Sequence, residues 1–199
     1  MHIELTDHLR CPSDHAESFL VLLPDTMDGR RVVRGTLGCP VCGTIVRVDD
    51  GVAEFGGGRP SNGRTALSAD AVGAFLGVSG PGGYIALAGG ATAVAPDLAA
   101  VLPGVGLVLV NPPAATADSV TASVLRAGRL PLKRGSMRGV VLGPDAAETT
   151  GWVADAVAAA LPGLRVVVES GASPPDGVEL LAVVEGCWVG KSQGGGGAL

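Results

Sequence analysis

The sequence predicts an α/β protein in which a small N-terminal metal-binding segment precedes a compact, doubly wound and mostly parallel sheet. Two observations predict this fold class. Short apolar runs alternate with alanine-rich helical stretches between residues 67 and 192, the pattern of parallel strands joined by crossover helices. Three of the four cysteines and all three histidines lie in the first 56 residues, where a metal can replace part of a hydrophobic core.

Composition narrows the possible function classes. Of the 199 residues 47% are apolar, the formal net charge is −5, and lysine occurs only at 133 and 191. These values exclude a wholly disordered chain and a strongly basic nucleic-acid binder. The sequence contains no uninterrupted run of about 18 apolar residues, so it predicts no membrane-spanning segment and no membrane partner. The first ten residues lack the apolar core of a secretory signal, and the cysteines are too few for a disulfide framework, so we expect a cytoplasmic protein.

The texture of the chain predicts four segments. Residues 1–56 form the metal-binding domain, and residues 67–192 form the α/β domain. Between them, residues 57–66 combine glycine, proline, serine and asparagine without apolar periodicity, which is typical of a linker. The last residues, 193–199, contain a run of four glycines, so we expect a flexible tail.

The elements of the α/β domain follow from its apolar runs. These runs are almost continuously apolar, which predicts strands covered on both faces. The expected strands are 84–87, 106–110, 123–125, 139–142, 164–168 and 180–184. The expected helices are 69–76, 93–102 and 146–161. Asp145 is placed to cap the third helix, and Pro162-Gly163 to end it.

The strongest chemical signal is the pair of cysteines in Cys39-Pro40-Val41-Cys42-Gly43. Two thiolates separated by two residues can bind one ion in a tight turn, and Gly43 permits that turn. Cys11 supplies a third thiolate. Zinc is favoured over a rubredoxin-like iron site, which would want four thiolates, and over three reduced thiols without a metal.

The fourth ligand is expected just after Cys11. Asp14 has the usual two-residue spacing, but imidazole suits a structural zinc site better than a single carboxylate, so we favour His15. Asp14 would then orient His15 from behind. His8 is a more distant alternative, and His2 and His8 are otherwise expected on the surface. The predicted zinc ligands are Cys11, His15, Cys39 and Cys42.

The residues around these cysteines carry a family resemblance. Residues 3–12 (IELTDHLRCP) and 37–52 (LGCPVCGTIVRVDDGV) resemble the small zinc-ribbon activator subunit that partners tRNA, rRNA and release-factor methyltransferases. The resemblance covers about residues 1–56 and implies a zinc ribbon that closes with a strand–turn–strand. It also implies a protein partner, either a methyltransferase or another translation-related protein. The chain departs from the family by lacking the fourth cysteine.

The larger domain resembles a class I S-adenosylmethionine-dependent methyltransferase in compact form, and therefore a Rossmann-like sheet. The most telling stretch is 126–142 (RAGRLPLKRGSMRGVVL), which is similar to the family's segment between the third and fourth strands. Residues 84–92 stand at the first strand and its glycine loop, and residues 106–113 at the second strand. Residues 178–191 are similar to the closing antiparallel hairpin.

The resemblance implies a cofactor site at Gly89, Gly90 and Asn111. The glycine turn lets the backbone approach the cofactor, and acids after the strands bind its ribose and adenine. In this chain the expected acids are replaced by Ala86, Asn111 and Ala127. Each lost charge-assisted hydrogen bond is worth about 1.5–3 kcal/mol. We therefore expect S-adenosylmethionine affinity to be reduced by roughly three orders of magnitude or more.

Three functions compete on these residues. The favoured one is a zinc-binding, non-catalytic methyltransferase-like protein that acts as a scaffold or regulator of a partner. The alternative is an active S-adenosylmethionine-dependent methyltransferase with a divergent cofactor site. A third is a metal-dependent nucleic-acid module that uses the basic stretch 126–138, but the acidic balance of the chain argues against nucleic acid as a partner.

Overall fold

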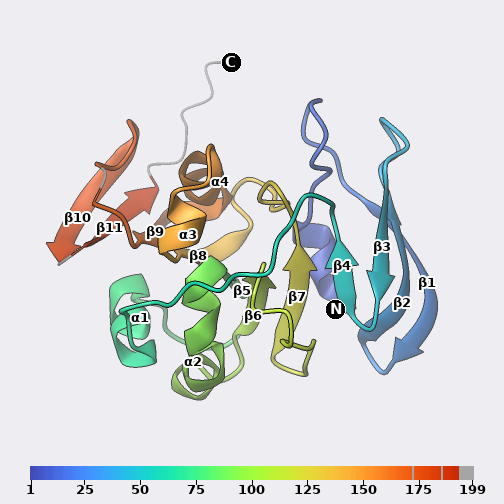
Figure 1. The fold of residues 1–199 in the computed structure, drawn as a ribbon, viewed down its shortest axis with the longest axis horizontal. Helices are drawn as coiled ribbons and strands as arrows, with labels where there is room; N and C mark the ends of the chain where they lie inside the picture. Colours follow the sequence, from blue (N-terminus) through green and yellow to red (C-terminus); the bar gives the residue numbers. More distant parts are fainter. Residues whose placement is uncertain (172, 185, 193–199) are drawn as a thin grey trace.

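The computed structural model describes residues 1–171, 173–184 and 186–192, so the tail predicted for 193–199 lies outside the described residues. Within them, eleven strands form one continuous sheet in the order β1-β2-β3-β4-β7-β6-β5-β8-β9-β11-β10 (Figure 1). The first four are β1 (Val21–Asp28), β2 (Arg31–Gly38), β3 (Ile45–Asp49) and β4 (Val52–Glu54). The rest are β5 (Tyr84–Ala88), β6 (Gly106–Val110), β7 (Ala122–Arg126), β8 (Met137–Leu142), β9 (Ala160–Val168), β10 (Val178–Val184) and β11 (Cys187–Ser192).

The sheet is mixed, which corrects the expectation of a mostly parallel one. Its centre is parallel, since β7, β6, β5, β8 and β9 pair in parallel and β4 joins β7 in the same sense. Both wings are antiparallel: β1 to β4 on one side, and β9, β11 and β10 on the other. The physical reason is connection length, because short hairpin turns can join only antiparallel neighbours.

Helices cover both faces of the parallel centre (Figure 1). On β5, Ile85 and Leu87 pack toward α1 (Ala69–Leu76), η2 (Gly89–Val94) and α2 (Ala95–Val101). Ala86 and Ala88 pack toward the opposite core, which contains α3 (Pro144–Ala147) and α4 (Trp152–Ala159). This alternation explains the near-continuous apolar runs, since each central strand is buried on both sides.

The helix predicted for 146–161 is wrong in length. The chain forms two short helices, α3 and α4, and Gly151 between them has a φ of 82° that a right-handed helix cannot accept. The helix ends at Ala159, before Pro162-Gly163, because the backbone is already extended at Ala160 and continues into β9. By contrast, the helix predicted for 69–76 is confirmed, with Ser68 as its cap.

The N-terminal residues share a core with the sheet. The 3-10 helix η1 (Ile3–His8) precedes Leu9, and both Leu5 and Leu9 are fully buried. They belong to the same cluster as Val108 of β6 and Trp152 of α4. The strand–turn–strand predicted before residue 56 is present as β3 and β4, and β4 continues the sheet onto β7. The first 56 residues therefore pack as part of one body with the rest.

A buried ion pair ties the beginning of the chain to the loop before β7. The carboxylate of Asp118 lies 2.8 Å from the Met1 ammonium and 2.8 Å from Nη2 of Arg31. The Asp118 and Met1 side chains are 1% and 0% exposed. Loss of one partner from a buried pair of this kind is costly, because the remaining charge stays buried without compensation.

None of the helices in the described part of the chain is long and apolar enough to cross a membrane.

Candidate functional site

The predicted metal ligands converge at one end of the N-terminal wing. Cys11 and His15 lie in the loop after η1, and Cys39 and Cys42 lie in the turn between β2 and β3. One ligand atom from each of the four lies within 4.8 Å of all the others. All four cysteines of the chain are free thiols, so no disulfide competes for these sulfurs.

The turn geometry brings the sulfurs together. The Gly43 N–H donates to the Cys39 carbonyl at 3.0 Å, and the Cys39 N–H donates to Thr44 O at 2.9 Å. Gly43 has a φ of 72°, which glycine adopts without strain. The sulfurs of Cys11 and Cys42 are 3.6 Å apart. A tetrahedral zinc with bonds of about 2.3 Å holds two sulfurs about 3.7 Å apart, so the spacing fits such an ion.

His15 completes the group, in line with the preferred fourth ligand. Its Nε2 lies 3.4 Å from the Cys39 sulfur, and its Nδ1 lies 2.6 Å from the Ala16 carbonyl. Because a carbonyl can only accept, Nδ1 carries the proton and Nε2 is left with the lone pair that a metal needs. Asp14 is exposed and lies outside the group. His8 packs its ring against Tyr84 instead.

The electrostatics of the cluster suit a cation. The pKa of Cys42 is lowered to about 5, first by the Thr44 hydroxyl 3.0 Å from its sulfur and then by the Thr44 backbone and the Ser13 hydroxyl. Burial raises the pKa of Cys11, because a thiolate loses hydration there. A metal ion would supply the charge that stabilises a second and third thiolate.

The predicted cofactor residues lie at the carboxyl ends of β5 and β6, the edge where parallel sheets bind ligands. Gly89 and Gly90 open η2 directly after β5, and Asn111 follows β6 with a φ of 54°. The Asn111 amide group is already used: its Nδ2 donates to Ala127 O at 2.7 Å, and its Oδ1 accepts from Ala127 N at 2.9 Å. Asn111 and Ala127, which stand where the resemblance expects cofactor-binding acids, are thus hydrogen-bonded to each other.

Asp145 occupies the mouth of the glycine turn, a role that sequence analysis missed. Its Oδ1 accepts from the Gly90 N–H at 2.8 Å, and its Oδ2 accepts from the Ser61 hydroxyl at 2.6 Å. The prediction that Asp145 caps the helix is wrong, because Gly143 is the N-cap residue of α3. One sequence signal pointed to this role: Asp145 closely follows β8, at the edge of the sheet where the glycine turn also lies.

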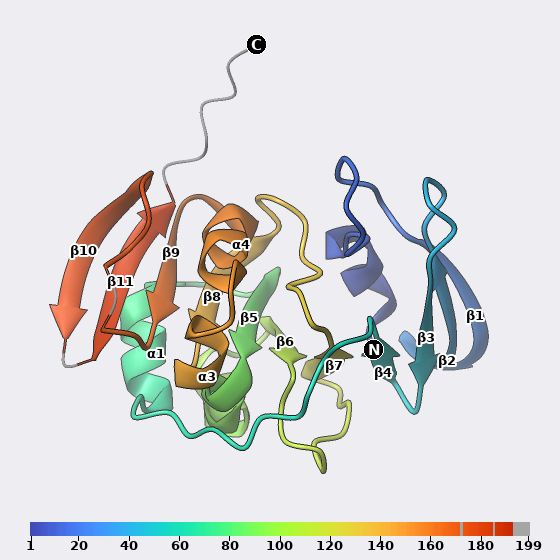
Figure 2. The same ribbon diagram turned by 45° about the horizontal axis from the view of Figure 1, so that its top comes forward.

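Residues 57–66, the predicted linker, cross the carboxyl ends of the central strands. We call this stretch the crossing segment (Figures 1 and 2). The Ser61 N–H donates to Asn111 O at 3.0 Å. At its far end the buried Glu169 accepts from the Thr65 hydroxyl at 2.6 Å and from the N–H of Ala66, the last residue of the segment, at 2.8 Å. These bonds anchor it from β6 to β9.

The crossing segment lies so close to the strand ends that some of the glycines at the contact leave no room for a Cβ atom. A Cβ on Gly58 would overlap the backbone nitrogen of Ala127. A Cβ on Gly90 would lie 2.9 Å from the carbonyl oxygen of Arg64. Glycine lets another backbone approach closely because it has no Cβ. At Gly90 the backbone that approaches is that of the crossing segment, where a cofactor would otherwise lie. A cavity of about 420 Å³ remains beside Gly89, Asn111 and Trp152.

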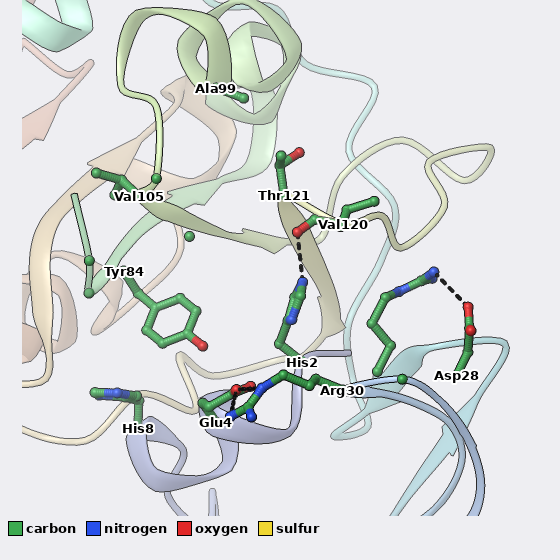
Figure 3. A pocket seen from close by; sticks show the side chains of 16 residues that line it. His2, Glu4, His8, Asp28, Arg30, Tyr84, Ala99, Val105, Val120 and Thr121 are labelled. Atoms are coloured by element: carbon green, nitrogen blue, oxygen red, sulfur yellow. Dashed lines mark hydrogen bonds and ion pairs between the residues drawn. The ribbon is translucent and has the colours of Figure 1, made fainter.

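A larger cavity, of about 860 Å³, opens at the opposite, amino-terminal edge of the parallel strands. Figure 3 shows Tyr84, His2, His8, Glu4 and Arg30 around it. His2 and His8, predicted on the surface, are partly buried in its wall. The Nε2 of His2 lies 2.8 Å from the Val120 carbonyl, and burial lowers the pKa of His8.

Comparison with known proteins yields structural neighbours alone. No family model matches the chain, and no curated protein matches it at a significant level. A SAM-dependent methyltransferase from Aquifex aeolicus aligns at 11% identity and a TM-score of 0.43, over 61% of this chain and 86% of that one. The antibiotic-resistance methyltransferase Kmr aligns at 12% identity and a TM-score of 0.43, over 69% and 99%. Neither likeness assigns an activity to this chain.

Proposed function

We propose that this chain is a zinc-stapled, non-catalytic protein built on a methyltransferase-like sheet, and that it acts through protein contacts rather than through a cofactor. One observation carries the proposal. At the carboxyl ends of β5 and β6, where a nucleotide cofactor would have to bind, Asp145 accepts from the Gly90 N–H, Ser61 of the crossing segment donates to the Asn111 carbonyl, and Ala127 bonds the Asn111 side chain.

The energetic cost of opening this edge supports the proposal. A ligand that takes the Gly90 N–H must first displace the Asp145 carboxylate from it. Because Asp145 is an exposed residue, solvent screens this bond, and it contributes on the order of 1 kcal/mol. One that uses Asn111 must also break its two bonds to Ala127. Since about 1.4 kcal/mol is a factor of ten in affinity, the two steps together weaken binding roughly tenfold or more.

Zinc has a structural role in this proposal. Three thiolates and one imidazole make a closed tetrahedral set without a position for substrate. When bound, the ion cross-links the loop after η1 to the turn between β2 and β3. That link adds to the hydrophobic packing of the N-terminal wing.

Calorimetric titration of the zinc-loaded full chain with S-adenosylmethionine tests the non-catalytic role. We expect no saturable heat up to about 1 mM ligand, which corresponds to less than about 4 kcal/mol of binding free energy. Asp145→Ala frees the Gly90 N–H, and binding gained by this variant alone would support displacement of the cofactor by Asp145. A micromolar dissociation constant for the unaltered protein would refute the proposal.

An active S-adenosylmethionine-dependent methyltransferase is the second candidate. The cavity of about 420 Å³ beside Gly89 and Asn111 favours it, because ligand pockets of about 300 Å³ and above are common. This candidate predicts saturable binding to the unaltered protein that Asn111→Ala weakens. The same titration separates the two functions.

The partner we propose is a protein, of the methyltransferase or translation-related class that the sequence resemblance implies. Exposed apolar side chains occur on the segments that carry the candidate metal ligands: Ile45 (60% exposed) pairs with Gly38 next to Cys39, Leu23 (63%) pairs with Thr36 on the same strand, and Phe19 (58%) follows Ser18, which bonds Cys11. Such a group is typical of a contact surface. Quantitative cross-linking in cells should give one methyltransferase or translation-related protein that Leu23→Glu loses and the control Val120→Glu keeps. Equal loss or no change in both variants would contradict the surface.

A further inference from the structure

The strand β10 forms one edge of the sheet and pairs only with β11 among the described residues. Its outward-facing N–H and C=O groups therefore have no strand to bond to. Exposed edges of this kind readily add another extended strand, because the hydrogen-bonding template is already in place.

The residues of β10 are those of a buried strand. Six of its seven residues are apolar (Val-Glu-Leu-Leu-Ala-Val-Val), and the same pattern predicted cover on both faces for 180–184. The fold instead leaves four side chains exposed, Leu180 at 47%, Leu181 at 41%, Val183 at 70% and Val184 at 46%. The cover that this pattern predicts is not supplied by the described part of the chain.

The opposite edge of the sheet shows how this chain protects an edge. There β1 contains Pro24, which cannot donate a ladder hydrogen bond, together with Asp25 and Asp28. Its pairing with β2 shifts register twice between Pro24 and Met27. Proline, charge and bulges of this kind prevent edge-to-edge pairing. In β10 there is one register shift, between Leu180 and Ala182, and neither proline nor lysine.

Charge on β10 also permits a second copy to approach. Its one charged residue, Glu179, lies 4.0 Å from Lys191 on β11. Two copies that meet at this edge therefore bring together neutralised pairs rather than bare like charges. An antiparallel two-fold arrangement presents the same strand to itself, so one surface serves both partners.

We propose that β10 is a self-association surface at which a second copy of this chain adds its own β10 in antiparallel pairing, to give a dimer with a sheet that runs through both protomers. The pairing would satisfy the free backbone groups of β10 and cover part of its exposed aliphatic side chains. This proposal does not depend on whether the cavity beside Gly89 and Asn111 binds a cofactor.

Sedimentation velocity of the zinc-loaded full chain between about 1 and 200 μM tests the proposal, since dissociation constants in this range correspond to weak but specific association. We expect the weight-average mass to rise from the protomer value of 19.6 kDa toward twice that value. Val183→Glu should weaken the dimer at least tenfold. Val120→Glu is the matched control, because Val120 is 78% exposed in a loop, and it should dimerise like the unaltered protein.

Hydrogen exchange gives a readout that does not depend on substitution. In the unaltered protein, the amides of β10 should exchange more slowly as concentration rises, while those of β1 should not change. A protein that stays at protomer mass at 200 μM would overturn the proposal. So would equal weakening by both substitutions, concentration-dependent protection confined to another element, or assembly only with a strand of a different protein.

Discussion

Replacing Asp118 with alanine is expected to destabilise the protein strongly. Asp118 is 1% exposed and holds two cations, the Met1 ammonium at 2.8 Å and Arg31 at 2.8 and 2.9 Å. Burial lowers the pKa of the Met1 ammonium despite the opposing effect of Asp118, which shows how costly that charge is inside the protein. Alanine would leave the Met1 ammonium without a counter-charge and leave Arg31 with only the exposed carboxylate of Asp28.

The magnitude follows from the environment of the pair. Removing one partner of a buried ion pair costs about 3–5 kcal/mol, because the remaining charge is uncompensated. A domain is typically stable by about 5–15 kcal/mol, so the variant should lose a large part of its stability. Asp28→Ala is the matched control. Asp28 lies 3.5 Å from the same arginine, but its side chain is 75% exposed, and exposed pairs contribute at most about 1 kcal/mol.

Urea denaturation, followed by tryptophan fluorescence and far-ultraviolet circular dichroism, measures both variants. Trp152 and Trp188 lie in the core of the sheet, so fluorescence reports on the part of the protein distant from Met1. The transition should move to lower urea with an unchanged slope for Asp118→Ala, and hardly move for Asp28→Ala. A loss below about 1 kcal/mol, or equal losses in both variants, would refute the account of Asp118 as the tie between the chain start and the sheet.

Three further predictions concern the shared core, the crossing segment and His8. Chelation of zinc or Cys39→Ser should lower the melting temperature of the whole molecule in one transition, because the N-terminal wing shares its core with the sheet; a second, unshifted transition by calorimetry would contradict this. Gly58→Ala should cost about 1–3 kcal/mol in urea denaturation, because a Cβ would overlap the Ala127 backbone, whereas Gly171→Ala, with nothing within 4 Å of its Cβ, should cost little. His8 should titrate by NMR below its ordinary pKa, because burial lowers its pKa. Its contribution to stability is therefore lost as pH falls below about 6.5 and levels off below the folded-state pKa. A midpoint at or above the ordinary value would contradict the buried position of the ring.

The candidate metal-binding group could be predicted from the sequence because its chemistry is local. Cys39 and Cys42 sit in one tight turn, and the choice of His15 over Asp14 followed from ligand preference alone. The central strands were equally accessible, since strands buried on both faces have continuously apolar residues. The helix expected over 146–161 failed because Gly151 adopts a left-handed conformation that alanine-rich neighbours conceal.

The course of residues 57–66 could not be predicted in the same way. Their composition is that of a linker, and composition does not tell whether a flexible segment is anchored. The anchoring partners, Asn111, Asp145 and Glu169, are distant in sequence and lie at the ends of three different strands. The sequence around Asp145 predicted a helix cap, because its actual partner, the Gly90 N–H, lies 55 residues away in η2 and local sequence does not reveal it.

The sequence by itself predicted the local features of this protein: the Cys/His group that could hold a metal, the buried central strands and the glycine turn after β5. Each of these depends on residue type and short spacing. Only the tertiary structure decided that one sheet joins the N-terminal wing to the rest, that the crossing segment covers the strand ends, and that β10 has no strand on its outer side among the described residues. These features depend on which distant backbone groups meet, and sequence periodicity contains no information about that pairing.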